Sequence, residues 1–216
     1  MRTTALALLL AAAPLSKAAA GAPDNATPAA ALAEAEALAK SNRFEQAVAL
    51  LQQTLKRAPK LVDGWVQLGN VQLNLGQNRQ AITAYQRALE LDSNLHDVRY
   101  NLAYALRSMG DHKAAIGAYQ TYLKGAPKDP DALFGLAESL KGDAQWSAAA
   151  DAFERYADAE DRPTQTRWAT YARKEAADLR AKNRTNEVTT EAALVEVPTV
   201  DDTPSVATVT DIDDED

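Results

Sequence analysis

Two histidines and a few closely spaced acids are the side chains in this sequence that would suit catalysis or metal binding. His96 and His112 stand in separate predicted turns or helix starts, with no third ligand type clustered beside them, and the chain has no cysteine. A zinc site needs three or four such ligands, so none is predicted. We expect His112 to pack half-buried against a neighbouring helix and His96 to be solvated.

The acids do not form a catalytic pair. Glu34 and Glu36 are two positions apart, as are Asp158 and Glu160, and this spacing places them on different faces of a helix. Acid and base catalysis needs groups that converge on one substrate. Glycine motifs that cradle phosphate, G-x-G-x-x-G and G-x-x-x-x-G-K-[ST], are absent from the sequence. The sequence therefore predicts a non-enzymatic protein with no cofactor or metal ion.

The net charge of −7 is unevenly distributed over the 216 residues. Residues 183–216 contain ten acids and one base, Arg184, for a net charge of −9, so residues 1–182 carry −7 − (−9) = +2. A protein that binds nucleic acid needs a basic face, and this nearly neutral body argues against one. A hydrophobic content of 46% with 25% charged residues is typical of a globular chain.

A repeat with a step of 34 residues organises the middle of the chain. Adding 34 in turn to position 47 gives Ala47, Ala81, Ala115 and Ala149. The same step gives Leu51, Tyr85, Tyr119 and Phe153 on one face, and the small residues Ala35, Gly69, Ala103 and Ala137 on another. A period of this length predicts one pair of antiparallel helices per unit.

Several of these residues form recognisable motifs. Trp65, Leu68 and Gly69 make W-x2-L-G, Ala81 and Tyr85 make A-x3-[FY], and Pro59 and Pro127 stand at unit ends. In these residues the chain resembles the tetratricopeptide repeat family. The resemblance implies an all-α, right-handed solenoid over residues 29–182, with units at about 28–61, 62–95, 96–129 and 130–163. The chain departs from the family where the first helix usually carries Tyr, at Leu38, Gln72, Leu106 and Leu140.

The first residues have the features of a secretory signal. Arg2 supplies a positive charge, an apolar run follows, and small residues precede Gly21. Residues 1–20 are therefore predicted to be a signal peptide and residues 21–28 a linker, which places the protein in the periplasm or outside the cell. A retained membrane anchor and a buried first helix are the alternatives. The apolar run is shorter than the roughly 20 residues that span a bilayer, so we expect no membrane span in the mature form.

The last part of the chain contains two predicted segments. Residues 164–182 form an amphipathic helix that is expected to cap the array, with Trp168, Tyr171, Ala172, Ala176 and Leu179 on its apolar stripe. The alternative is a helix that binds a membrane surface or a partner. Residues 183–216 are predicted to be a disordered acidic tail. This tail would solubilise the protein, bind a partner, or fold back into the protein's own groove.

The family resemblance also implies that the first helix of each unit lines a concave groove. The groove residues would be Asp63, Val66, Asn70, Leu73, Asp97, Tyr100, Asn101, Tyr104, Arg107, Asp131, Phe134, Glu138 and Lys141. Tyr100 and Tyr104 share a helix face, and Phe134 follows Tyr100 by one step. These three residues are expected to form an aromatic patch that binds protein or, alternatively, packs as core between units.

One groove chemistry of the family is testable on the sequence. Chaperone-binding relatives hold a peptide's terminal carboxylate with a clamp of lysine, arginine and asparagine. Asn70 and Asn101 resemble the amides of that clamp. The required bases are replaced by Val66, Asp131 and Gly135. An adaptor for chaperone tails is therefore not expected.

These observations predict a protein–protein interaction module or scaffold in an extracytoplasmic compartment. It would bind a peptide or partner segment in the concave groove. The alternative is a structural subunit of a cell-envelope complex that uses its end or convex surfaces. In that case the groove would be filled by another subunit or by the acidic tail.

Overall fold

The structure is a computed structural model that describes residues 27–195, and within these residues the chain is helical and has no strand. The elements are α1 (Pro28–Lys40), α2 (Phe44–Arg57), α3 (Val62–Asn74), α4 (Asn78–Leu91), α5 (His96–Ser108), α6 (His112–Leu123), α7 (Pro130–Gly142), α8 (Trp146–Ala159), the 3-10 helix η1 (Pro163–Gln165) and α9 (Thr166–Val195). The predicted all-α fold is confirmed. The predicted signal peptide and residues 196–216 of the predicted tail lie outside the described residues.

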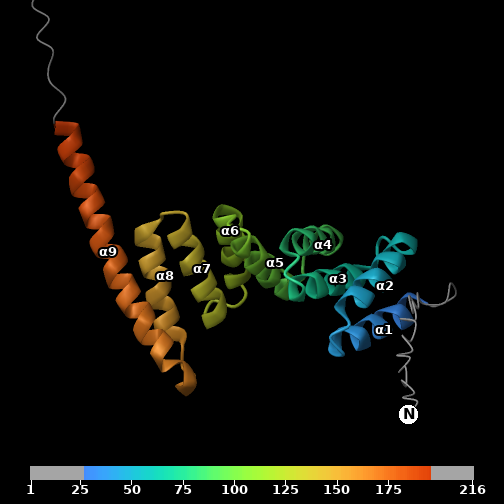
Figure 1. Cartoon of the computed structure of the whole chain (residues 1–216). Helices are drawn as coiled ribbons and strands as arrows, with labels where there is room; N and C mark the ends of the chain where they lie inside the picture. Colours follow the sequence, from blue (N-terminus) through green and yellow to red (C-terminus); the bar gives the residue numbers. More distant parts are fainter. Residues whose placement is uncertain (1–26, 196–216) are drawn as a thin grey trace, which may run out of the picture.

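The helices form four consecutive pairs. The first helices α1, α3, α5 and α7 begin at Pro28, Val62, His96 and Pro130, which are 34 residues apart. Each first helix packs against the second helix of its own pair, and that second helix packs against the next first helix. Figure 1 shows the pairs following one another along the molecule, as in an α-solenoid. Each pair therefore buries its apolar face against its neighbours.

The turn inside each pair is built on a residue in the left-handed backbone region. Asn42, Gly76, Gly110 and Ala144 have φ angles of 57°, 70°, 80° and 58° and are again one step apart. Glycine adopts this conformation without a steric penalty, and asparagine tolerates it. Gly76 and Gly110 therefore suit the turns that follow α3 and α5. Ala144 holds the same conformation at a cost of about 1–2 kcal/mol.

The repeated positions form the core of the array. Ala47, Ala81, Ala115 and Ala149 have no exposed surface, and Leu51, Tyr85, Tyr119 and Phe153 are at most 1% exposed. Alanine on one helix lets the facing helix approach closely enough for these large side chains to be enclosed. The buried residues fall into two clusters. One cluster joins α1, α2 and α3 with Ala84 of α4, and the other extends from α4 to α9.

Helix α9 packs against α8 at the end of the array (Figure 1). Among the side chains of α9 that the structure describes, Ala169, Ala172, Ala176 and Leu179 are buried. The helix has 30 residues and ends at Val195, so the expected boundary at residue 182 is wrong, and residues 183–195 are helical rather than disordered. The physical reason is that no glycine or proline interrupts the chain between Pro163 and Pro198.

Candidate protein-binding surface

A hollow of about 280 Å³ lies on the face formed by α5, α7 and the start of α9. It is lined by Tyr100, Tyr104, Arg107, Tyr119, Asp131, Phe134, Gly135, Tyr156, Arg162, Gln165 and Trp168. We call these residues the aromatic hollow. The predicted groove residues among them are Tyr100, Tyr104, Arg107, Asp131 and Phe134. The structure therefore brings these five side chains together around one space.

The aromatic side chains of the hollow also belong to the packing between helices. The ring centroid of Tyr100 lies 6.0 Å from that of Tyr119, and the centroid of Phe134 lies 5.3 Å from that of Tyr156. Tyr100 and Phe134 are half-buried against the core, whereas Tyr104 is 41% exposed. Tyr100 and Phe134 therefore pack on the core, as the second alternative expects, and also line the hollow, while binding of protein by the patch stays a prediction.

Burial affects the acidity of the hollow's tyrosines. The pKa of Tyr100 is raised to about 12, mainly because burial disfavours the charged phenolate, with smaller contributions from Tyr119 and Asp131. Burial also raises the pKa of Tyr119. At neutral pH both phenols keep their protons. They therefore remain able to donate a hydrogen bond on this face.

Two arginines of the hollow have different surroundings. Arg162 binds Asp131, with 2.9 Å between Nη2 and Oδ1, and also binds Glu160. This pairing lowers the pKa of the Glu160 carboxyl. Arg107 lies with its guanidinium carbon 5.3 Å from the centre of the Tyr104 ring, and its buried Nε has no hydrogen-bond partner among residues 27–195. Arg162 is thus paired with two carboxylates, whereas Arg107 has a hydrogen bond with the Tyr119 hydroxyl and no carboxylate partner among residues 27–195.

The predicted groove residues of α3 lie on a different part of the same face. Asn70 Oδ1 accepts hydrogen bonds from the Tyr85 hydroxyl at 2.8 Å and from Asn101 Nδ2 at 3.2 Å, which ties α3 to α4 and α5. A smaller hollow of about 130 Å³ is lined by Ala35, Glu36, Ala39, Gln67, Asn70, Val71 and Asn74, and we call it the amide hollow. The amides that resemble a carboxylate clamp are therefore bonded to each other.

The remaining predicted groove residues line neither hollow. Asp63 and Asp97 are exposed at the starts of α3 and α5, and Val66 and Leu73 are half-buried. Glu138 is also half-buried, and Lys141 forms an ion pair with Glu175 of α9. The hydrogen bond from Lys141 to Glu175 raises the pKa of Lys141. The structure therefore does not join all predicted residues into one site.

The two histidines are packing residues. His96 stacks on Tyr122 with 4.4 Å between ring centroids and lies against Gly125, so the expectation that it is solvated is wrong. Its imidazole is flat enough to fill the space over a residue without a side chain. His112 is half-buried against Gly142, as expected. Across the described part of the chain, no three His, Cys, Asp or Glu residues gather as a metal site would require, and no helix is long and apolar enough to cross a membrane.

A match to a protein-family model shows which known proteins the chain is related to. The model of the cytochrome c-type biogenesis protein H TPR domain matches residues 30–164, which is more than half of the sequence. The chain belongs to this tetratricopeptide family. The family resemblance expected from the motifs is thereby confirmed. No curated protein matches the chain by sequence.

Solved structures of MamA share the fold of this tetratricopeptide array. A MamA structure from Desulfovibrio magneticus RS-1 is 19% identical with a TM-score of 0.61, and the match covers 75% of this chain and 96% of that one. A second MamA crystal structure is 20% identical with a TM-score of 0.59, covering 80% of this chain and 97% of the other. At these identities the likeness shows the fold alone.

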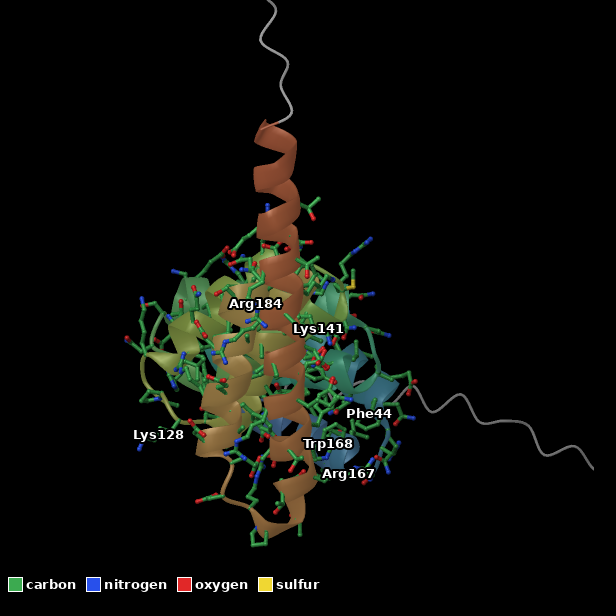
Figure 2. All side chains as sticks on the ribbon, turned by 90° about the vertical axis from the view of Figure 1, so that its left-hand side faces the viewer. Phe44, Lys128, Lys141, Arg167, Trp168 and Arg184 are labelled. Atoms are coloured by element: carbon green, nitrogen blue, oxygen red, sulfur yellow. The ribbon has the colours of Figure 1, made fainter. Side chains whose placement is uncertain are left out.

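The tetratricopeptide step also locates a surface residue that the sequence analysis assigns to the wrong face. Trp168 and Tyr171 were expected on the buried stripe of the last helix, but they are 46% and 37% exposed. Trp168 stands 34 residues after Phe134, so one more step of the repeat places it on the face of the first helices. Its ring lies 6.4 Å from that of Phe134, and Figure 2 shows it on the same side of α9 as Lys141. Helix α9 therefore contributes to the aromatic hollow as a first helix of a fifth unit would.

Proposed function

We propose that this chain is a non-enzymatic interaction module that holds a peptide or partner segment on the face of its first helices. The observation that carries the proposal is the aromatic hollow, onto which the exposed rings of Tyr104 and Trp168 open. Aromatic side chains in partly enclosed sites supply most of the binding energy in many protein interfaces. The large exposed area of these two rings supports a role in binding.

The family supports the same kind of function. Tetratricopeptide arrays are generally non-catalytic and generally bind protein partners. The family of this chain is named for cytochrome c-type biogenesis and is associated with periplasmic cytochrome maturation. A role as a scaffold or adaptor fits a family with that name and a fold with these surfaces.

We further propose that the module acts in an extracytoplasmic compartment. The proposal is supported by the signal-like composition of residues 1–20 and by the family's association with periplasmic maturation. Sequencing the N-terminus of the protein purified from its native cells tests it. A mature chain that begins at Gly21 is expected, and a chain that keeps Met1 and stays in the cytoplasmic fraction would contradict the proposal.

The groove proposal is tested with a double variant, Tyr104→Ala with Trp168→Ala, in the full chain. Both side chains are exposed, so the variant is expected to stay folded and to lose the partners that co-purify with the native protein. The matched control is Met109→Ala, since Met109 is 44% exposed and does not line the hollow. A folded double variant that retains the same partners would reject the groove and favour binding through end or convex surfaces.

A further inference from the structure

We propose that the aromatic hollow binds an acidic segment of a separate partner protein, in which an aspartate or glutamate lies beside a bulky apolar side chain. The apolar side chain contacts Phe134 and Trp168, and the carboxylate pairs with Arg107. This inference rests on the proposed function, because it specifies the chemistry of the partner for the same surface.

The size and walls of the hollow determine the apolar part of the ligand. A space of about 280 Å³ is slightly smaller than the 300–1,000 Å³ that is usual for small-molecule clefts, so it accommodates one or two side chains. Phe134 and Trp168 meet edge to face, with 75° between their rings. An aliphatic or aromatic side chain inserted beside these rings removes apolar surface from water on both partners.

The charge of the hollow determines the polar part. Arg107 has a hydrogen bond with the Tyr119 hydroxyl, but its buried Nε has no acceptor, and no carboxylate among residues 27–195 pairs with its guanidinium. A hydrogen bond to a charged group is stronger than one between neutral groups, and a carboxylate is the strongest acceptor for a guanidinium. Binding an acidic side chain would therefore give the Arg107 guanidinium the carboxylate partner that it lacks among residues 27–195.

The other cations near the hollow already have carboxylate partners. Arg162 is bound to Asp131 and Glu160, and Lys141 is bound to Glu175. The charged residues that line the hollow are Arg107, Asp131 and Arg162, whose charges sum to +1, and Arg107 is the cation among them without a carboxylate partner. An acidic segment complements this surface, whereas a basic segment would place like charges together.

This combination occurs at one place in the array. Leu73 stands one step of 34 residues before Arg107, and its side chain carries no charge. Lys141 stands one step after Arg107, and it forms an ion pair with Glu175. Within residues 27–195, only the unit that contains α5 therefore offers a cation without a carboxylate partner beside aromatic rings from the next two first-helix positions, Phe134 and Trp168. Helix α9 is part of the binding site as well as the end of the array.

Synthetic peptides test the inference directly. The probe is a fluorescent Gly/Ser peptide with a central Phe-Asp pair and both termini blocked, and its binding to the full chain is measured by anisotropy. Matched peptides carry Phe-Asn, Phe-Lys or Gly-Asp, and a fifth ends in a free carboxylate without the aspartate. The Phe-Asp peptide is expected to bind about tenfold more tightly than Phe-Asn, since a charge-assisted hydrogen bond contributes about that factor.

Variants then assign the two contacts. Arg107→Gln is expected to bind Phe-Asp and Phe-Asn equally, while Arg107→Lys keeps part of the preference because it keeps the charge. Trp168→Ala should weaken both peptides by a similar factor and leave their ratio unchanged. Met109→Ala serves as the control and should change nothing. Circular dichroism and thermal unfolding of each variant separate loss of binding from loss of fold.

Four results would overturn the inference. They are no binding of the Phe-Asp probe, a preference for Phe-Lys, an Asp preference that survives Arg107→Gln, and tighter binding of the free-carboxylate peptide. Tighter probe binding by a chain shortened to residues 1–195 would show that residues 196–216 fill the hollow, and would also reject a separate partner. The proposed function is judged separately by the double variant Tyr104→Ala with Trp168→Ala. If this variant loses the native partner, the proposed function holds even where one of these outcomes rejects the acidic ligand.

Discussion

The amide hollow and the aromatic hollow lie on the same face of one repeat array, yet they differ in chemistry. Between α1 and α3, the lining includes Gln67, Asn70 and Asn74. Between α5 and α9, it is dominated by tyrosine, phenylalanine and tryptophan around one arginine that has no carboxylate partner among residues 27–195. Since the backbone repeats and the surface side chains do not, the buried positions set the fold. We propose that the exposed positions of the first helices select the partner.

The buried positions should be equally costly to change at both ends. Phe153→Ala is expected to lower the free energy of unfolding by about 3–5 kcal/mol and Leu51→Ala by about 2–5 kcal/mol, because both side chains have no exposed surface. Urea denaturation measures both. Hydrogen exchange should place each local loss in that residue's own core cluster. If either variant lowered hydrogen-exchange protection equally in both core clusters, the two regions would not be energetically separate.

The close approach of helices should be tested at one glycine from each region. A methyl group at Gly69 would overlap the Tyr85 ring, and one at Gly135 would overlap the Tyr119 ring. Gly69→Ala and Gly135→Ala are each expected to destabilise the fold by about 1–3 kcal/mol through overpacking. Tyr119 lines the aromatic hollow, so only Gly135→Ala should also weaken peptide binding. Gly117→Ala, where a methyl group meets open space, is the control.

The turns of the two regions should respond with smaller and unequal changes. Ala144→Gly is expected to stabilise the protein by about 1 kcal/mol, because glycine removes the strain of the positive φ angle. Asn42→Gly, at the equivalent turn of the first pair, should change stability by only a few tenths of a kcal/mol, since asparagine tolerates this conformation. Thermal unfolding compares the two variants. A destabilised Ala144→Gly protein would contradict the assigned strain.

The smallest expected effect is a pH dependence beside the aromatic hollow. The pKa of Glu160 is lowered from its ordinary value of 4.5, chiefly by the hydrogen bond from Arg162. A lowered folded-state pKa stabilises the fold above the unfolded value, and this contribution is lost as the pH falls through the folded-state value. The protection of the η1 amides from hydrogen exchange, relative to their intrinsic exchange rate at each pH, should therefore fall on acidification below pH 4.5.

The control for this prediction is Glu160→Gln, which should remove the pH dependence at η1. Glu36 in the other region is paired with Lys40, and its pKa is also lowered, but both side chains are exposed. Acidification should there affect only the last turn of α1. The same acid response at η1 in Glu160→Gln would show that another group is responsible.

The sequence predicts the buried frame well because that frame repeats. Ala81 and Tyr85 recur at a constant step, so each copy supports the assignment of the others, and the structure buries all of them. Gly76 and Gly110 predict their turns because few residues other than glycine adopt a positive φ. The recurrence at Ala144 is predictable only from its position, since alanine carries no preference for that conformation.

The aromatic hollow is only partly predictable. Tyr100, Tyr104 and Phe134 follow from the repeat, and Trp168 would follow if the repeat were continued by one step. The hydrophobic stripe of the last helix misassigns Trp168, because an amphipathic pattern does not distinguish a buried ring from one at the edge of a groove. The pairing of Arg162 and the lack of a carboxylate partner for Arg107 among residues 27–195 depend on distances between helices, which spacing along the chain does not determine.

The most direct test of binding on the face of the first helices is site-specific photo-crosslinking in the native cell. A photoreactive phenylalanine analogue replaces Tyr104 in the aromatic hollow, Asn74 in the amide hollow, or the exposed Gln120 of α6 in three otherwise identical full-length proteins. We expect a cross-linked partner from position 104 and none from position 120. Position 74 should give a weaker cross-linked product or none. A partner captured from position 120 and not from position 104 would contradict this expectation.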